Sequence, residues 1–383
     1  MNTLALIVLS MAIAGIFYAY AGYPLTLAAI GLFVKRPAVK CCIEPSVTLI
    51  VTAYNEESRI RSKLENCLQI DYPENALQII IASDGSVDNT NEIICEYGDK
   101  GIGFLHVKER KGKENAQNEA LQKAKGDIIV FSDVATILGP DAIRQIVGNF
   151  ADPSIGCVSS MDKVIAETGN KDGGGEGAYV KYEMWIRLLE SRINTVVGLS
   201  GSFFAARKEV CRNFSVNMDS DFRTLLNSRK AGMRGIVDPA AFGFYKSVNT
   251  TSHEFSRKIR TVVRGLTVFF HSIEFCNFFK YGLFSWQYIS HKLLKWLVPF
   301  FLILAFAANA VLALENGFFR WLLGAQIVFY VFAAIPFIHE SPRYPFPIKI
   351  PHFFISVNAA IAIAWFKFIR GDRIIVWQPT NRK

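Results

Sequence analysis

Two acidic residues end short apolar runs in positions where a carboxylate can bind a ligand. They are Asp84, in the segment SDGSVDNT, and Asp133, in the segment FSDVATIL. A carboxylate at Asp84 can accept the imide N–H of a uracil ring. Gly85 permits a tight turn there, and Asp88 can cap the helix that follows. The alternative is an ordinary capped turn without a ligand.

The second acidic position, Asp133, points to metal or phosphate chemistry. A carboxylate that ends a buried strand is costly unless it has a partner, and a divalent metal bound to a diphosphate is one such partner. Hard oxygen ligands suit Mg²⁺ or Mn²⁺. Upstream, the basic segment RKGKENAQN places Lys113 at a predicted helix start, where free N–H groups favour anions such as pyrophosphate. A solvated charge cluster is the alternative for this segment.

A third acidic segment, MDSDF, contains two candidates for a general base. Transfer of a group to a hydroxyl needs a base that takes the hydroxyl proton. Asp221, ahead of an apolar helical pattern, is the first candidate, and Asp219 is the second. The turn-like segment GLSGSFF precedes both.

The elements that would position these residues alternate between strands and helices from Ser46 to about Ser160. The predicted strands are Val47–Thr52, Leu77–Ala82, Ile128–Phe131 and Ile155–Ser159, and the predicted helices are Glu57–Gln69, Asn89–Tyr97, Glu114–Lys125 and Asp141–Phe150. Apolar strands separated by helices predict an α/β fold with a mostly parallel sheet covered on both faces. Ligands bind such sheets at the carboxyl ends of the strands.

The rest of the chain is apolar enough to belong in a membrane. Hydrophobic residues make up 51% of the 383 residues, and the formal net charge is +9. Leu4–Val34 has no charged residue and is long enough to cross a bilayer. Further candidate spans are Trp296–Leu314, Phe319–Ile338 and His352–Ile369, and Leu266–Leu283 is predicted to be an interfacial amphipathic helix. Nucleic-acid binding is disfavoured, since no basic stripe or known binding module is present.

These patterns predict four regions. Residues 1–40 hold an N-terminal transmembrane helix, 41–265 a cytoplasmic domain, 266–292 the interfacial helix, and 293–383 the C-terminal transmembrane helices and tail. Lys35, Arg36 and Lys40 follow the first span and place the next domain inside. The basic C-terminal tail also prefers the inside, yet four spans would put it outside. Either one C-terminal segment does not cross, or the charge rule fails here.

Taken in order, the motifs resemble the family 2 glycosyltransferases with a GT-A fold. The motifs are TAYNEE, SDGSVDNT, GKENAQNEAL, FSDVATIL, GLSGSFFAARKEV and SDFRTLL, with Gly232 and Asp238-Pro239-Ala240 behind them. The resemblance covers about residues 46–265. The flanking apolar segments resemble those of cellulose-synthase-like, hyaluronan and chitin-oligosaccharide synthases. The resemblance implies an inverting glycosyltransferase that uses a UDP-sugar and lies in a bacterial inner or cell membrane. It also implies that other polysaccharide-assembly proteins act together with this enzyme.

The resemblance also implies roles for individual positions. Ala53, Tyr54, Glu56 and Asp84 would line the nucleoside pocket, Lys113 would approach the diphosphate, and Asp133 would bind the metal. Gly198, Ser200 and Gly201 match the acceptor-side turn, Arg257 and Arg260 would contact the diphosphate, and the spacing to Gly232 places Asp221, rather than Asp219, at the catalytic base.

Two departures from the family pattern bear on function. The second aspartate of the D-x-D motif is Ala135, which removes the usual metal ligand. The Q-x-x-R-W motif of processive polymer synthases has become RKIRT, so Thr261 replaces a tryptophan that forms the floor under the acceptor sugar. The favoured hypothesis is transfer of a sugar to a glycan. Transfer of a single sugar to a polyprenyl phosphate or another lipid is the alternative. A non-catalytic membrane protein is the third possibility.

Three smaller features complete the expectations. The seven cysteines form no C-x-x-C pair and are expected to be reduced thiols. The glycine-rich segment Gly169–Gly177 is expected to be a loop, either a linker or a gate over a site. Glu183 and Glu190 are seven residues apart and share a helix face, where an acceptor-site role and a structural role are both open.

Overall fold

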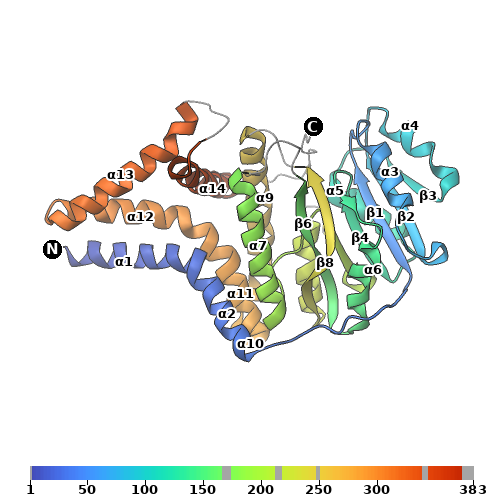
Figure 1. Ribbon diagram of the computed structural model, residues 1–383, viewed down its shortest axis with the longest axis horizontal. Helices are drawn as coiled ribbons and strands as arrows, with labels where there is room; N and C mark the ends of the chain where they lie inside the picture. Colours follow the sequence, from blue (N-terminus) through green and yellow to red (C-terminus); the bar gives the residue numbers. More distant parts are fainter. Residues whose placement is uncertain (1, 166–173, 212–217, 247–250, 339–343, 373–383) are drawn as a thin grey trace. The chain divides into compact units, whose positions relative to one another are not determined.

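The computed structural model describes residues 2–165, 174–211, 218–246, 251–338 and 344–372 (Figure 1). Within it the chain forms two compact units. An α/β unit contains Gly31–Asn249 together with Thr267–His271, and a helical unit contains Met1–Ile30, Thr250–Leu266 and Ser272–Arg373.

The α/β unit is built on one mixed sheet of eight strands in the order β3-β2-β1-β4-β7-β6-β8-β5. The strands are β1 (Val47–Ala53), β2 (Leu77–Asp84), β3 (Ile102–Val107), β4 (Ile128–Asp133), β5 (Ile137–Leu138), β6 (Ile155–Ile165), β7 (Phe203–Arg207) and β8 (Arg234–Lys246). Strands β1 to β4 pair in parallel, and so do β6 and β8, whereas β7 runs antiparallel to both β4 and β6.

Helices cover both faces of this sheet and create two apolar cores. One core packs β-strand side chains against α3 (Ile60–Leu68), α4 (Thr90–Cys95) and α6 (Ala142–Val147). The opposite core includes residues of α5 (Lys113–Lys123) and α8 (Ser220–Lys230). The long helix α7 (Gly174–Ile193) packs beside β8. The short 3₁₀ turns of the unit are η2 (Glu74–Ala76), η3 (Gly98–Lys100), η4 (Gly148–Ala151) and η5 (Lys208–Cys211).

The predicted strands correspond to β1, β2, β4 and β6, and the predicted helices to α3, α4, α5 and α6. Strands β3, β5, β7 and β8 were not predicted. The loop expected over Gly169–Gly177 is partly wrong, because Gly174 already begins α7. The preceding residues 169–173 lie outside the described residues. All seven cysteines are free in the structure.

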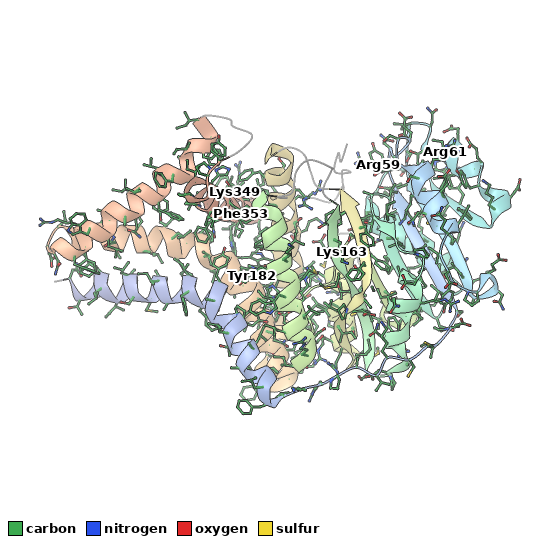
Figure 2. The ribbon with its side chains drawn as sticks, in the orientation of Figure 1. Arg59, Arg61, Lys163, Tyr182, Lys349 and Phe353 are labelled. Carbon is green, nitrogen blue, oxygen red and sulfur yellow. The ribbon has the colours of Figure 1, made fainter. Side chains whose placement is uncertain are left out.

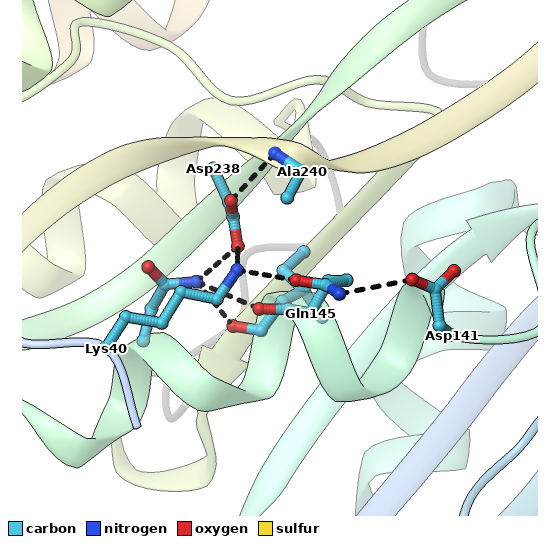
Figure 3. Close-up of polar contacts among 7 residues, drawn as sticks. Lys40, Asp141, Gln145, Asp238 and Ala240 are labelled. Atoms are coloured by element: carbon cyan, nitrogen blue, oxygen red, sulfur yellow. Dashed lines mark hydrogen bonds and ion pairs between the residues drawn. The ribbon is translucent and has the colours of Figure 1, made fainter. Parts of the chain in front are cut away.

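A polar network ties the segment before β1 to the distant strand β8 (Figure 3). The ammonium of Lys40 lies 2.8 Å from Asp238 Oδ2 and also donates to Gln145 Oε1 at 2.8 Å. Asp238 is only 3% exposed, and it accepts further hydrogen bonds from Asn149 Nδ2 at 2.7 Å and Ala240 N at 2.9 Å. Lys40, expected to mark the inner membrane face, thus neutralises a buried carboxylate.

The helical unit is built from long apolar helices. Its elements are α1 (Thr3–Phe17), α2 (Tyr23–Phe33) as far as Ile30, α9 (Thr251–His271) as far as Leu266, α10 (Phe278–Tyr281), α11 (Leu283–Tyr288), α12 (Lys295–Ala313), α13 (Gly317–Ile338) and α14 (Phe346–Ile369), with the 3₁₀ turn η6 (Ile273–Cys276) and the π turns η1 (Tyr18–Gly22) and η7 (Ile289–Leu294). Among the described residues, four helical segments are long and apolar enough to cross a membrane: Thr3–Phe33, Leu283–Ala313, Gly317–Ile338 and Pro347–Ile369.

Close packing holds α1 against α12 in this unit. A side chain at Gly15 would lie 2.8 Å from the Phe301 ring, so glycine permits the approach of the two helices. Small residues let apolar helices pack closely where no hydrophobic driving force exists. Asn309 Nδ2 also donates to Gln326 Oε1 at 2.7 Å, which pairs two polar side chains of α12 and α13.

The helix expected over Leu266–Leu283 is not continuous. The amphipathic helix α9 ends at His271, and a new helix begins after Asn277, whose side chain accepts the N–H of Phe279 at 3.0 Å as a cap. Gly282, with φ of +54°, then ends α10. The break follows from these capping residues.

Candidate active site

Asp84, at the end of β2, holds the loop that leads into α5. Its Oδ1 accepts the N–H of Lys111 at 3.0 Å, and its Oδ2 accepts the N–H of Gly112 at 2.8 Å. The side chain is 3% exposed. Each carboxylate oxygen has a second lone pair, so Asp84 can also accept a ligand N–H. Its predicted contact with a nucleobase remains a prediction.

Unusual backbone conformations shape the loops beside Asp84. Gly85 has φ of +67°, and a Cβ there would lie 2.8 Å from the Arg110 backbone nitrogen, so glycine is required. Asn55 adopts φ of +50° at the end of β1, where its side-chain Oδ1 accepts the N–H of Val87 at 2.9 Å. The strand-end loops after β1 and β2 are therefore fastened to each other.

Tyr54 lies in the same group of loops, and the Arg110 guanidinium is stacked 3.6 Å from the centre of its ring. Stacking of arginine on an aromatic ring is favourable, and such a pair offers a planar surface to a nucleobase. Arg110 was not predicted as a site residue.

Four of the predicted residues meet at the carboxyl end of β4. The Lys113 ammonium forms an ion pair with Asp133 and donates to the Gly201 carbonyl at 3.1 Å. Burial lowers the pKa of Lys113, but Asp133, Glu114 and Asp221 together outweigh this effect and raise it above its usual value. Lys113 is therefore a cation held between α5, β4 and the turn before β7.

Asp221 faces the same turn from the first turn of α8. A Cβ on Gly201 would lie 3.0 Å from Asp221 Oδ2, so the absence of a side chain at Gly201 leaves room for this carboxylate. Its Oδ1 accepts the N–H of Phe222 at 2.7 Å, and this bond fixes the carboxylate at the helix start. Asp221, Lys113 and Asp133 thus converge around Gly201.

The turn before β7 is itself held by a residue that was not predicted. Asp162 Oδ1, on β6, accepts hydrogen bonds from Ser200 Oγ at 2.6 Å and Ser202 Oγ at 2.8 Å. Ser200 is 2% exposed, and its N–H donates to Ser159 Oγ at 2.7 Å. Ser200 therefore stabilises the turn through buried hydrogen bonds. Gly198 in the same turn is buried as well.

The segment that carries this geometry matches a known family. Residues 48–214, which contain the strand ends, Lys113, Asp133 and the Gly201 turn, match the family described as glycosyl transferase family 2. Over these residues the chain matches a family 2 glycosyltransferase domain.

Curated relatives of this glycosyltransferase domain include polysaccharide synthases. Over 132 residues it is 32% identical to the poly-beta-1,6-N-acetyl-D-glucosamine synthase of Staphylococcus aureus strain COL, a match that covers 34% of this chain and 32% of the relative. The synthase of Staphylococcus epidermidis is 31% identical over 120 residues, which cover 31% of this chain and 29% of that protein. The match thus spans about a third of the length of these relatives.

A solved structure with the same fold is the mannosyltransferase PcManGT from Pyrobaculum calidifontis in complex with GDP-Man and Mn²⁺. It is 23% identical, has a TM-score of 0.74, and the match covers 96% of this chain and 100% of that one. The predicted fold, a GT-A α/β domain with a mostly parallel sheet and apolar helices at both ends, is confirmed.

Some predicted residues lie elsewhere than in the centre of the glycosyltransferase domain. The Ala53 methyl is packed in the core beside α3, so only its main chain can face a ligand. Arg257 and Arg260 lie on α9, in the helical unit, and their contact with the diphosphate stays a prediction. Glu190 on α7 is fully buried and accepts the N–H of Val197 at 3.2 Å, which favours the structural role for it.

Lys63 of α3 is another residue that was missed. It is fully buried, and its ammonium donates to Ser132 Oγ at 2.8 Å and to the Thr136 carbonyl at 2.6 Å. A sequence signal existed, because Lys63 falls between Ile60, Leu64 and Cys67 on the apolar stripe of a predicted helix. Burial lowers the pKa of Lys63 below its usual value.

The glycosyltransferase domain fits a divalent metal poorly. The position of the second aspartate is Ala135, and the Asp133 carboxylate is paired with Lys113. Among the described residues, no group of three His, Cys, Asp or Glu side chains could hold a metal ion. Mg²⁺ and Mn²⁺ favour several oxygen ligands. The expected site at Asp133 offers one carboxylate, and that carboxylate is already paired with Lys113.

A buried carboxylate beside this site has an unusual pKa. Burial raises the pKa of Glu56 to about 7, although Arg59 lowers it through an ion pair at 2.6 Å; Asp133 and Asp88 add to the increase. Glu56 is 2% exposed, and its N–H donates to Thr90 Oγ1 at 2.8 Å. Arg59 lies at the start of α3 (Figure 2).

Figure 2 also labels Lys163 of β6, whose ammonium lies 3.3 Å from the centre of the Phe242 ring.

Glu56 is expected to make the stability of the domain depend on pH. The pKa of Glu56 is 4.5 in the unfolded chain and about 7 in the folded state, so the folded state binds the Glu56 proton more tightly. The free energy of unfolding therefore falls as pH rises from 4.5 to about 7. Glu56→Gln should remove this fall, which amounts to at most about 3 kcal/mol. Thermal unfolding of the detergent-solubilised chain on both sides of this pH range measures it.

The control for this experiment is Glu109→Gln, which removes a carboxylate that is 78% exposed. That variant should keep the pH profile of the wild type. Parallel profiles for the wild type and Glu56→Gln would show that Glu56 does not titrate in this range.

Proposed function

We propose that this chain is a membrane-embedded inverting glycosyltransferase that moves a sugar from a UDP-sugar to a glycan acceptor during surface polysaccharide biosynthesis. The observation that carries the proposal is the convergence of Asp221, Lys113 and Asp133 around Gly201. This arrangement places a candidate base and a buried cation on the two sides of one turn.

The residues suit an in-line displacement at the anomeric carbon. Asp221 takes the proton of the acceptor hydroxyl while the hydroxyl oxygen bonds to the anomeric carbon. The bond from that carbon to the diphosphate oxygen breaks, and the diphosphate leaves with the electron pair. Lys113 neutralises the charge that develops on the leaving group.

The identities of donor and acceptor rest on the relatives and on the strand-end residues. The staphylococcal relatives are synthases of an N-acetylglucosamine polymer, which supports a hexose or hexosamine donor and a polysaccharide product. The mannosyltransferase was solved with GDP-Man, so GDP-sugars belong among the donors to be tested. Asp84 and the Tyr54–Arg110 pair would receive the base.

Transfer of a single sugar to a polyprenyl phosphate or another lipid is the second candidate function. The observation that favours it is Thr261, an exposed residue of α9 at the position of the family's acceptor-binding tryptophan. Without an aromatic floor, a growing sugar chain loses a stacking surface. The apolar helices would bring a lipid acceptor to the enzyme.

We also propose a multi-pass membrane protein with a cytoplasmic glycosyltransferase domain. The four apolar helical segments support several crossings, and the basic residues that follow the first segment support the orientation. The basic tail after residue 372 lies outside the described residues. Other polysaccharide-assembly proteins would be its partners.

Incubation of the purified chain in lipid nanodiscs with a panel of UDP-sugars and GDP-sugars tests the function. The acceptors are an oligosaccharide and a polyprenyl phosphate, and products are identified by mass spectrometry and on a gel. A ladder supports glycan extension, and one lipid-linked sugar supports the second function. Nucleotide binding with no product from any acceptor contradicts both.

A further inference from the structure

The segment from Ser132 to Thr136, where a D-x-D motif would bind metal, is held by lysines from both faces of the sheet. From the side of α3, Lys63 donates to Ser132 Oγ and to the Thr136 carbonyl, the residues that flank Asp133 and Ala135. Lys63 is fully buried, so these contacts fix its ammonium directly beneath the segment. Among the described residues, its hydrogen-bond acceptors are these two oxygens.

From the side of α5, Lys113 approaches the same segment. It pairs with the Asp133 carboxylate and donates to the Gly201 carbonyl at 3.1 Å, and it is 9% exposed. Its partners belong to β4 and to the turn before β7, and these two strands are adjacent in the sheet. The ammonium is thereby aimed at the point where the candidate base Asp221 also lies.

The charges of this site differ from those of a metal-binding D-x-D site. Two carboxylates and a divalent ion would balance each other there, and the ion would face the diphosphate. Here Ala135 removes one carboxylate, and the remaining one is neutralised by Lys113. A divalent ion would have to displace the Lys113 ammonium from Asp133, whereas an incoming diphosphate meets a cation that is already in place.

We propose that Lys113 replaces the divalent ion, so that the nucleoside diphosphate binds through this ammonium without metal. Asp133 acts as a positioning residue that aims Lys113, and Lys63 holds the segment that carries Asp133. The inference rests on the proposed function for the nature of the ligand, a nucleoside diphosphate. It departs from the expectation that Mg²⁺ or Mn²⁺ is required.

The test is calorimetric binding of UDP, with GDP as a second probe, to the full chain in nanodiscs. Titrations are run in EDTA and in excess Mn²⁺. We expect the dissociation constant of the preferred nucleotide to differ by less than about threefold between the two conditions. Binding that is more than about tenfold tighter in Mn²⁺ would overturn the inference while the proposed function stands. If neither UDP nor GDP binds in either condition, the proposed function fails together with the inference.

Ala135→Asp provides a converse test, since it restores the second carboxylate. This variant should acquire a metal response, with nucleotide binding at least about tenfold tighter in Mn²⁺ than in EDTA. Ala231→Asp adds the same charge at an exposed position at the end of α8 and should show no such response. Equal behaviour of the two variants would count against the proposed site.

Lys113→Met separates a diphosphate contact from a purely structural role. It should weaken UDP binding by about a hundredfold in EDTA and leave uridine, which has no diphosphate, nearly unaffected. Lys113→Arg should recover part of the UDP affinity. Equal losses for UDP and uridine would mean that Lys113 only supports the fold of the pocket, which contradicts the proposal.

Discussion

Replacement of Asp221 by asparagine is expected to lower the rate of sugar transfer by about 10²- to 10⁴-fold. The amide keeps the shape of the side chain and can still accept the Phe222 N–H, but it cannot take a proton from the acceptor hydroxyl. Nucleotide affinity should change little, because the candidate base faces the acceptor. Initial rates with saturating donor, together with calorimetric UDP binding, measure both quantities.

The matched control is Asp219→Asn, two residues earlier and just before the first turn of α8. It removes an equal charge from the same short segment and should retain most of the wild-type rate. The opposite result, with Asp219→Asn inactive and Asp221→Asn active, would assign the base to Asp219.

The second large effect is expected at Asp84. Asp84→Asn turns one of the two acceptor oxygens into an N–H₂ group, which then faces the N–H of Lys111 or Gly112. Hydrogen bonds to a charged group contribute about 1.5–3 kcal/mol, so UDP affinity should fall about tenfold to a hundredfold as the loop before Lys113 loses its anchor. UDP titration of the full chain measures the change.

Asp127→Asn serves as the control for Asp84→Asn. Asp127 is also an aspartate next to a strand of the sheet, but it precedes β4, and its carboxylate accepts the Ser46 hydroxyl at 2.6 Å. It lies at the end of the sheet opposite to the site. Equal losses of UDP affinity in the two variants would indicate a general effect on stability rather than the loss of the loop anchor.

The strands that carry the site were predictable because of how they are buried. β1, β2 and β4 are covered by helices on both faces, so each is a continuous apolar run that ends abruptly in polar residues. β8 has no such signature, since it contains Pro239 and two glycines and its pairing with β6 shifts register twice. β7 has only five residues, and β3 is interrupted by Gly103.

The site was predictable as a set of residues but not as a set of contacts. Motif order identified Lys113, Asp133, Gly201 and Asp221, which the fold brings together. Both carboxylate oxygens of Asp84 accept hydrogen bonds from backbone N–H groups. These contacts depend on the path of the loop before α5, and no local sequence pattern determines that path. Asp162 was equally hidden, because it precedes neither a turn motif nor a helix start and acts through two serines.

The contact between Lys40 and Asp238 has a practical consequence for anyone who expresses the glycosyltransferase domain alone. The family match begins at residue 48, and β1 begins at Val47, so truncation just before the first strand would look natural. Such a protein would leave Asp238 buried without its cation, and Gly148 without the Cys41 N–H that its carbonyl accepts at 3.1 Å. A version of this domain without the apolar helices should therefore begin near Gly31, where the α/β unit begins. It then keeps the segment before β1 that contains Lys40 and Cys41.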